Sequence, residues 1–256
     1  MPSEPQTNAI ALVLLAHQDD EFALQAMLTQ AVRQGLQVHC AYLTHAPDAV
    51  TNARRNAESL RVLQALGVQA DHLQWAGAKL GIVDGQLVDH LPLCAQWLHA
   101  QLQRLQPLQI WVPAWEGGHP DHDGLHACAV WAAQHLEQLH RVRQFGLYNA
   151  WRRPAPTFRV LTPLPANGPA QSHPMPWAER WRYLRHCLAY PSQWRSWLGL
   201  LPPVAWHLLV HGKLYSQGVS PARLQHRPHS GHLYYENRGF ADWVKVQSAV
   251  QRLMQM

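Results

Sequence analysis

The apolar run at residues 9–16, which reads Ala-Ile-Ala-Leu-Val-Leu-Leu-Ala, constrains the fold of this chain more than any other feature. A strand with one face in water alternates apolar and polar residues, whereas a strand covered on both faces is apolar almost throughout. We therefore expect this segment to form a central strand of a parallel sheet that carries helices on both faces.

Helical and strand-like segments alternate along the chain as far as about residue 150. Because such alternation is typical of right-handed crossovers between parallel strands, the predicted fold class is α/β, with a mainly parallel sheet flanked by helices. Helices are expected over residues 21–34, 52–66, 91–105 and 122–139. Further strands are expected over residues 38–43, 73–75, 108–112 and 145–150, with a loop over residues 77–88.

The sequence changes character after residue 150, where seven prolines lie between residues 154 and 176. A helix is expected over residues 177–189, and another ends the chain. The apolar stretch 194–210 contains Pro202 and Pro203, which argue against a membrane-spanning helix.

The length of 256 residues is sufficient for one large α/β domain. We predict a single domain over residues 1–256. Its core is expected at residues 9–150, and a mixed C-terminal extension at residues 151–256 is expected to shape the substrate groove.

The charge balance is moderately basic, with a formal net charge of +5. The arginines are scattered, so a solvated surface is the simpler explanation and attraction to an anionic substrate the alternative. Nucleic acid is not an expected partner, since no binding motif is present. The four cysteines are far apart, which predicts reduced, buried thiols. Residues 1–8 lack the basic start of a signal peptide, so we predict a cytoplasmic location.

Two clusters of acidic and histidine residues each follow a predicted strand. Residues 16–21 read Ala-His-Gln-Asp-Asp-Glu, and residues 118–122 read Gly-His-Pro-Asp-His. In open α/β sheets the ligand site lies beyond the carboxyl ends of the strands. We therefore expect the two clusters to meet at one edge of the sheet and to supply the groups of a metallohydrolase.

His17, Asp20 and His122 are the expected metal ligands. A catalytic zinc site takes three protein ligands, His and carboxylate among them, and keeps one position for water. The spacing of His17 and Asp20 at a strand-to-helix turn directs both side chains toward one point, and His122 begins a predicted helix. The sequence does not distinguish Zn²⁺ from Fe²⁺ or Co²⁺, because selectivity at such a site depends on geometry and supply.

Three other residues of the clusters are the expected catalytic groups. Asp19 is free to act as a general base on water, and His119 is placed to stabilise an oxyanion or to protonate a leaving amine. Asp121 is expected to hold His119 in one tautomer and to raise its pKa. Taken singly, each motif has a simpler explanation, since Asp often caps helices, and Glu21 is expected to brace the helix start.

The two clusters resemble the paired motifs of the PIG-L / LmbE-like zinc-dependent N-acetylglucosamine deacetylase family, Ala-His-Pro-Asp-Asp-Glu and His-Pro-Asp-His. Gln18 stands where the first motif usually has proline, a position that is not a ligand. The resemblance covers about residues 9–150 and implies a Rossmann-like fold. It also implies one Zn²⁺ per chain, held by His17, Asp20 and His122.

Three residues outside the motifs are expected to contact substrate. Arg55 matches the family's Arg-x-x-Glu helix, although an ion pair between Arg54 and Glu58 explains the pattern equally well. Asp84 lies in a segment similar to the family's Leu-Gly-x-x-Asp-Gly-x-Leu loop, and it either touches a sugar hydroxyl or only forms an Asp-Gly turn. Trp115 either stacks on a sugar ring or packs in the core.

The resemblance implies a zinc-dependent deacetylase that acts on a small molecule or glycan bearing an N-acetyl group. It implies Asp19 as the base and His119 with Asp121 as the proton-donating pair. Two alternatives stay open. One is an amidohydrolase acting on a different acyl amide, such as a thiol conjugate or a natural product, and the other is a sugar- or nucleotide-binding module without turnover.

Overall fold

The structure is a computed structural model that describes residues 9–256. The segment at residues 1–8, for which we predicted the absence of a signal peptide, lies outside the described residues. No helix within residues 9–256 combines the length and the apolar character that crossing a membrane requires.

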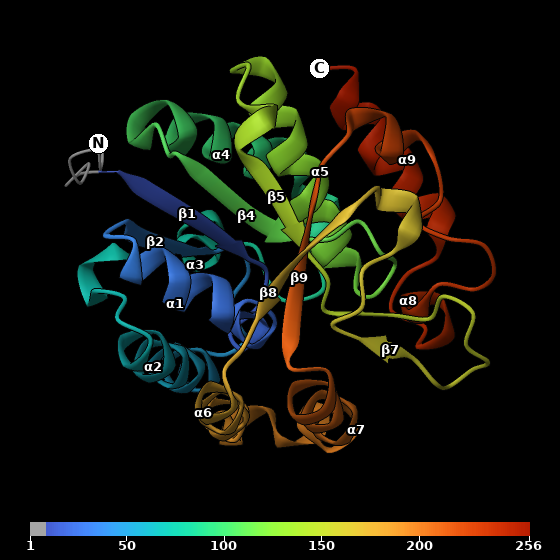
Figure 1. Ribbon diagram of the computed structural model, residues 1–256. Helices are drawn as coiled ribbons and strands as arrows, with labels where there is room; N and C mark the ends of the chain where they lie inside the picture. Colours follow the sequence, from blue (N-terminus) through green and yellow to red (C-terminus); the bar gives the residue numbers. More distant parts are fainter. Residues whose placement is uncertain (1–8) are drawn as a thin grey trace.

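The described residues form one central sheet in the strand order β3-β2-β1-β4-β5-β9-β8 (Figure 1). The first five strands of this order are parallel, whereas β9 is antiparallel to both β5 and β8. The predicted α/β fold with a mainly parallel sheet is therefore confirmed. The strands span Ile10–Leu15 (β1), Gln37–Tyr42 (β2), Leu73–Trp75 (β3), Gln109–Pro113 (β4), Val142–Phe145 (β5), Ala170–Pro174 (β8) and Lys213–Gly218 (β9).

A separate two-stranded ribbon pairs β6 (Tyr148–Asn149) with β7 (Arg159–Val160). The expected strand at residues 145–150 is thus wrong in its bounds, because the chain breaks at Gly146 and Leu147 between β5 and β6. At this break the carboxylate of Glu116 accepts the backbone N–H groups of Leu147 and Tyr148.

Helices cover both faces of the sheet (Figure 1). The predicted loop at residues 77–88 is partly wrong, because α3 begins it, and the helix expected at residues 21–34 is preceded by a 3-10 turn at Asp20–Ala23. The helices span Gln25–Arg33 (α1), Ala49–Ala65 (α2), Ala76–Leu80 (α3), Leu91–Leu105 (α4), Pro120–His135 (α5), Trp177–Cys187 (α6), Trp194–Trp206 (α7), Tyr234–Asn237 (α8) and Trp243–Met254 (α9).

The two faces of β1 belong to two separate hydrophobic clusters. Leu12 and Leu14 point into the cluster that includes α4, α5 and α9, and Val13 and Leu15 point into the cluster that includes α1, α2, α6 and α7. Successive side chains of a strand point to opposite faces, so both sets must be apolar where both faces are covered. This arrangement explains the uninterrupted apolar run.

The C-terminal extension is joined to the core by the sheet and by side-chain contacts. Strands β8 and β9 extend the sheet past β5, and the ring of Trp197 packs edge-on against Phe22 with centroids 5.3 Å apart. The hydroxyl of Tyr183 donates a hydrogen bond to Thr29 over 2.9 Å. We propose on these grounds that the core and the extension form a single domain.

Candidate active site

The sheet brings the two motifs together. Val13 of β1 pairs with Trp111 of β4 in parallel register, so both strands end at the same edge of the sheet. The first motif follows β1 in a tight turn, and the second forms the first turn of α5 after β4. The expected meeting of the two clusters at one sheet edge is found.

His17, Asp20 and His122 converge on one point. The Nδ1 atom of His17 lies 3.2 Å from Nε2 of His122, and that Nε2 lies 3.0 Å from Oδ1 of Asp20. All three side chains are buried. Although burial opposes it, the neighbouring His122 and His17 hold the pKa of Asp20 below its ordinary value, so the carboxylate is ionised.

The three residues fit a divalent metal ion. Bonds of about 2.0–2.1 Å from zinc in a tetrahedral arrangement place neighbouring ligand atoms roughly 3.3 Å apart. The nitrogen and oxygen atoms of this group are separated by similar distances, and all lie within 4.8 Å of one another. Two imidazole nitrogens that face each other and a carboxylate are suited to binding a cation through their lone pairs.

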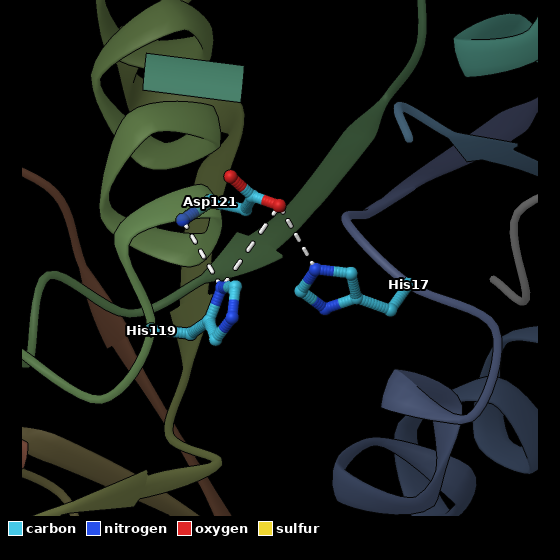
Figure 2. A group of neighbouring side chains, drawn as sticks. All are labelled: His17, His119 and Asp121. Atoms are coloured by element: carbon cyan, nitrogen blue, oxygen red, sulfur yellow. Dashed lines mark hydrogen bonds and ion pairs between the residues drawn. The ribbon is translucent and has the colours of Figure 1, made fainter. Parts of the chain in front are cut away.

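The carboxylate of Asp121 lies closer to His17 than to His119. Its Oδ2 atom lies 3.0 Å from Nε2 of His17 but 4.0 Å from Nδ1 of His119 (Figure 2). The Asp121 carboxylate also accepts backbone N–H bonds from Gly85 and Leu87, which fix its position. A metal-binding histidine typically donates its second ring N–H to such a carboxylate. We expect from the sequence that Asp121 holds His119 in one tautomer; its backbone N–H makes that bond, whereas its carboxylate contacts His17 more closely.

His119 stands at the N-terminus of α5. Its Nδ1 atom accepts the backbone N–H of Asp121 over 3.2 Å, so the ring proton belongs on Nε2 (Figure 2). Burial lowers the pKa of His119 to about 4, and nearby His17 adds to the decrease. The expected increase is not found, because the attraction of Asp121 is smaller than these two effects.

Asp19 occupies a strained backbone position beside the proposed ligands. Its φ of 118° is uncommon for a residue with a side chain and carries an energetic cost that the surroundings must offset. Its backbone N–H donates to Oε2 of Glu21 over 3.1 Å, and Tyr190 donates its hydroxyl to Oε1 of the same carboxylate over 2.7 Å. Glu21, which we expected to brace the helix start, therefore holds the Asp19 turn.

A cavity of about 620 Å³ opens beside these groups. His17, Asp19, Asp20 and His119 lie in its wall. The rest of the wall comes from α2, the α3–α4 connection, the β6–β7 region and the extension, and includes Arg55, Asp84, Tyr148, Phe158, Gln193, Arg195, Ser196, Leu200, Tyr234, Arg238 and Phe240.

Arg55 and Asp84 meet in this cavity. The Nη1 atom of Arg55 lies 3.0 Å from Oδ2 of Asp84, whose other oxygen lies 3.2 Å from Nε2 of His17. The alternative ion pair of Arg54 with Glu58 is also present, at 3.3 Å. The two explanations of the Arg-x-x-Glu pattern are thus compatible, because adjacent residues of a helix point in different directions.

Trp115 does not contact the cavity, which corrects the expectation that it binds substrate. Its side chain is 0% exposed and packs against Trp243 with ring centroids 5.9 Å apart. Its indole N–H donates to the backbone oxygen of His226 over 3.0 Å. The ring turns inward because its apolar surface and its polar N–H both find partners in the C-terminal extension.

Several wall residues carried no signal in the sequence. Tyr148, Tyr234 and Phe240 are separated from the motifs along the chain, and only the tertiary structure brings their rings to the cavity. The segment at residues 190–193 had no predicted role. Within it, Ser192 hydrogen-bonds Glu58, and Gln193 donates to the backbone oxygen of Gln18 beside the first motif.

A mostly parallel sheet with histidines and carboxylates gathered beyond β1 and β4 defines this chain as an α/β protein with the fold of known deacetylases. Residues 12–133 match the PIG-L family model, described as GlcNAc-PI de-N-acetylase, so this segment belongs to the PIG-L family. The resemblance recognised from the two motifs is confirmed. No curated protein matches the sequence.

Solved structures of low sequence identity share the fold. A deacetylase triple mutant of the teicoplanin biosynthetic pathway has a TM-score of 0.63 at 18% identity, covering 83% of this chain and 98% of its own. A conserved protein from Thermus thermophilus, TT1542, has a TM-score of 0.60 at 22% identity, with coverages of 83% and 94%. The N,N'-diacetylchitobiose deacetylase from Pyrococcus horikoshii has a TM-score of 0.53 at 16% identity, with coverages of 88% and 90%.

Proposed function

We propose that this protein is a metal-dependent deacetylase that hydrolyses the N-acetyl group of an amino sugar or of a glycoconjugate bearing one. The observation that carries the proposal is the convergence of His17, Asp20 and His122 beside a cavity whose wall also holds Asp19 and His119. The PIG-L match and the deacetylase fold of the structural neighbours support it.

His17, Asp20 and His122 would hold one Zn²⁺ per chain. When bound, such an ion polarises an amide carbonyl and makes water a better nucleophile. The protein fixes the ligands in advance. Backbone N–H groups of Ala16 and His17 donate to Oδ2 of Asp20 over 3.0 and 2.8 Å, and Asp121 holds the far nitrogen of His17.

Asp19 is the proposed general base. Asp19 lines the cavity next to the ligand residues, and Glu21 holds the backbone turn that carries its carboxylate. A base held in this way accepts the proton of the attacking water and avoids the cost of ordering during the reaction.

His119 is the proposed hydrogen-bond donor to the oxyanion. With Nδ1 occupied by the backbone N–H of Asp121, the imidazole carries its proton on Nε2 and reaches the cavity wall as a hydrogen-bond donor. It thereby stabilises the developing oxyanion through this hydrogen bond, and the leaving amine receives the proton that Asp19 accepted from the water. Asp121 contributes to both groups, through its carboxylate to His17 and through its backbone to His119.

The cavity wall has the composition expected for a sugar site. The aromatic rings of Tyr148, Phe158 and Tyr234 lie in contact with one another, with centroid distances from 5.0 to 6.2 Å, and offer apolar faces for a pyranose ring. The Arg55–Asp84 pair supplies a donor and an acceptor for sugar hydroxyl groups.

The test is a metal analysis of the purified protein combined with acetate release from a panel of N-acetylhexosaminides and their glycoconjugates. We expect one equivalent of metal and a release that a chelator abolishes and added Zn²⁺ restores. The variant His122→Ala should lose the metal, while the matched exposed variant His140→Ala should keep it. Turnover of an acylated thiol conjugate alone would favour the other amidohydrolase, and metal-free protein without turnover would favour a binding module.

A further inference from the structure

The helices α6 and α7 expose large apolar side chains to solvent. They lie side by side at the lower edge of the molecule in Figure 1, outside the sheet. Scattered exposed apolar residues are normal on protein surfaces, whereas a concentrated group marks an interaction site. The group, here called the α6–α7 apolar surface, consists of Trp177, Trp181, Leu188, Trp194, Leu198, Trp206 and Val210, each about half exposed or more.

The spacing of these residues places them on one side of each helix. On α6, Trp177 and Trp181 are four residues apart, and Leu188 follows two turns later along the same stripe. The opposite stripe of α6, with Tyr183 and Cys187, is buried in the protein. Packing within the protein explains the buried stripe of an amphipathic helix, but it does not explain a second apolar stripe that is exposed.

The same division holds for α7. Trp197 and Val204 face the protein interior, whereas Trp194, Leu198 and Trp206 are exposed. Tryptophan is costly to leave in water, and it is enriched where one end of a side chain is apolar and the other is wet, as at the membrane interface.

The charged residues of the chain segment that carries this surface are almost all positive. Residues 151–235 contain ten Arg or Lys and one acidic residue, Glu179. That single carboxylate is already paired with Arg33 over 2.5 Å. Arg185 and Arg195, which are exposed on α6 and α7, have no ion pair among the described residues.

We propose that the α6–α7 apolar surface docks onto an anionic lipid bilayer, lying in the headgroup region without spanning it. A surface with tryptophan and leucine on one side and arginines around it combines apolar insertion with attraction to anionic lipids. A second copy of this chain fits less well, because the arginines of the two copies would face each other without intervening carboxylates.

The docked orientation would bring the cavity near the membrane. The stripe of α7 next to the apolar surface carries Ser196, Gly199 and Leu200, which line the cavity described above. The inference does not depend on the proposed deacetylase activity, since its test measures lipid binding alone.

The first measurement is co-sedimentation of the full-length protein with vesicles of phosphatidylcholine alone and with vesicles containing about 30% phosphatidylglycerol. We expect binding to the anionic vesicles that is at least tenfold stronger than to the neutral ones and that weakens as salt is added. Absence of binding to the anionic vesicles would overturn the proposal.

The second measurement distinguishes binding through the α6–α7 apolar surface from nonspecific binding to vesicles. The double variant Trp181→Glu/Leu198→Glu should bind anionic vesicles at least tenfold more weakly, because it removes two anchors and adds two negative charges. The control variant Val244→Glu changes a valine on α9 that is as exposed as Leu198. This variant should bind vesicles like the wild type. Equal loss in both variants would contradict the assignment. Circular dichroism of each variant confirms that it is folded.

The third measurement tests the role of charge and the competing occupant. Arg185→Gln should weaken binding to the anionic vesicles about fivefold and leave binding to neutral vesicles unchanged. Sedimentation velocity without lipid should show a monomer. A dimer that the double variant dissociates would show that a second copy, rather than a bilayer, covers this surface.

Discussion

Among the described residues, every buried carboxyl group lies in residues 9–150, whereas the exposed tryptophans lie in residues 151–256. The buried carboxyl groups of the described residues all lie in the first region, and they are Asp19, Asp20, Glu21, Glu58, Glu116, Asp121 and Asp123. A buried carboxylate is costly unless hydrogen bonds or charges compensate it, so the first region is specified by polar partners. The extension buries no carboxyl group among the described residues, and it contacts the core both through apolar side chains such as Trp197 and through hydrogen bonds such as that of Tyr190 with Glu21.

This difference assigns separate tasks to the two regions. The first supplies the proposed metal ligands, base and oxyanion-stabilising histidine, and the second supplies aromatic wall residues and an outward surface. If the division is correct, substitutions at the candidate active site should alter chemistry, whereas those in the extension should alter stability or binding.

The largest expected effect is on turnover in Asp19→Asn. Loss of a general base lowers kcat by about 10²–10⁴-fold. Metal content should be unchanged, because Asp19 is not among the proposed ligands. The matched variant Asp71→Asn removes an exposed carboxylate and should keep full activity. Initial rates of acetate release and elemental analysis measure both quantities, and equal loss of metal and rate would contradict the assigned role.

The next prediction tests whether the two regions unfold together. Trp197→Ala in α7 removes a buried ring that packs on Phe22, and should lower the free energy of unfolding by about 3–5 kcal/mol. Leu98→Ala in α4 should cost about 2–5 kcal/mol. In urea titrations both variants should unfold in one transition. A second transition seen only with Trp197→Ala would mean that the extension unfolds independently.

A smaller effect is expected from acid. Burial lowers the pKa of His126 to about 4, with a further contribution from Arg223, and Nδ1 of the ring is hydrogen-bonded to the backbone oxygen of Pro113. Below about pH 6.5 His126 binds a proton in the unfolded chain but not in the folded protein. The free energy of unfolding therefore decreases as the pH falls from 6.5 to 4. This loss amounts to about 3 kcal/mol.

The measurement is the difference in unfolding free energy between the wild type and His126→Gln across this pH range. Taking the difference removes the contribution of Glu116, which is present in both proteins. That contribution has the opposite dependence on pH, because burial raises the pKa of Glu116 to about 8. A difference that is constant with pH would show that His126 is accessible to protons in the folded state.

The smallest expected effect is on KM, and it distinguishes the roles of the neighbouring Arg54 and Arg55. Arg55→Ala removes the cavity partner of Asp84 and should raise KM about tenfold, which corresponds to one charged hydrogen bond. Arg54→Ala removes only a partly exposed ion pair with Glu58, and KM should change less than about twofold. Equal effects would mean that Arg55 acts on helix stability alone.

The elements of the core were predictable where the pattern is local. The helix expected at residues 91–105 and the strand at residues 73–75 match α4 and β3. Pro107 is the sequence signal for the end of α4, and the structure adds a left-handed Gln106 directly after the helix. Side-chain periodicity and helix breakers act within a few residues, which is why sequence reasoning finds them.

The antiparallel edge of the sheet was not predictable. Strand β8 is mostly exposed and polar, and it meets β9 only after the intervening α6 and α7 have turned the chain back. The sequence of β8 lacks the alternation of apolar and polar residues that would indicate a strand. Its pairing arises from contacts between distant segments.

The sequence by itself determined that β1 is covered on both faces and that histidines and carboxylates follow two strands at one sheet edge. Only the tertiary structure decided which partner each group takes. Asp121 holds His17, a residue 104 positions away, and Trp115 turns into the core. The reason is physical, because periodicity reflects neighbours along the chain, whereas a hydrogen bond depends on distances that only the packed fold sets.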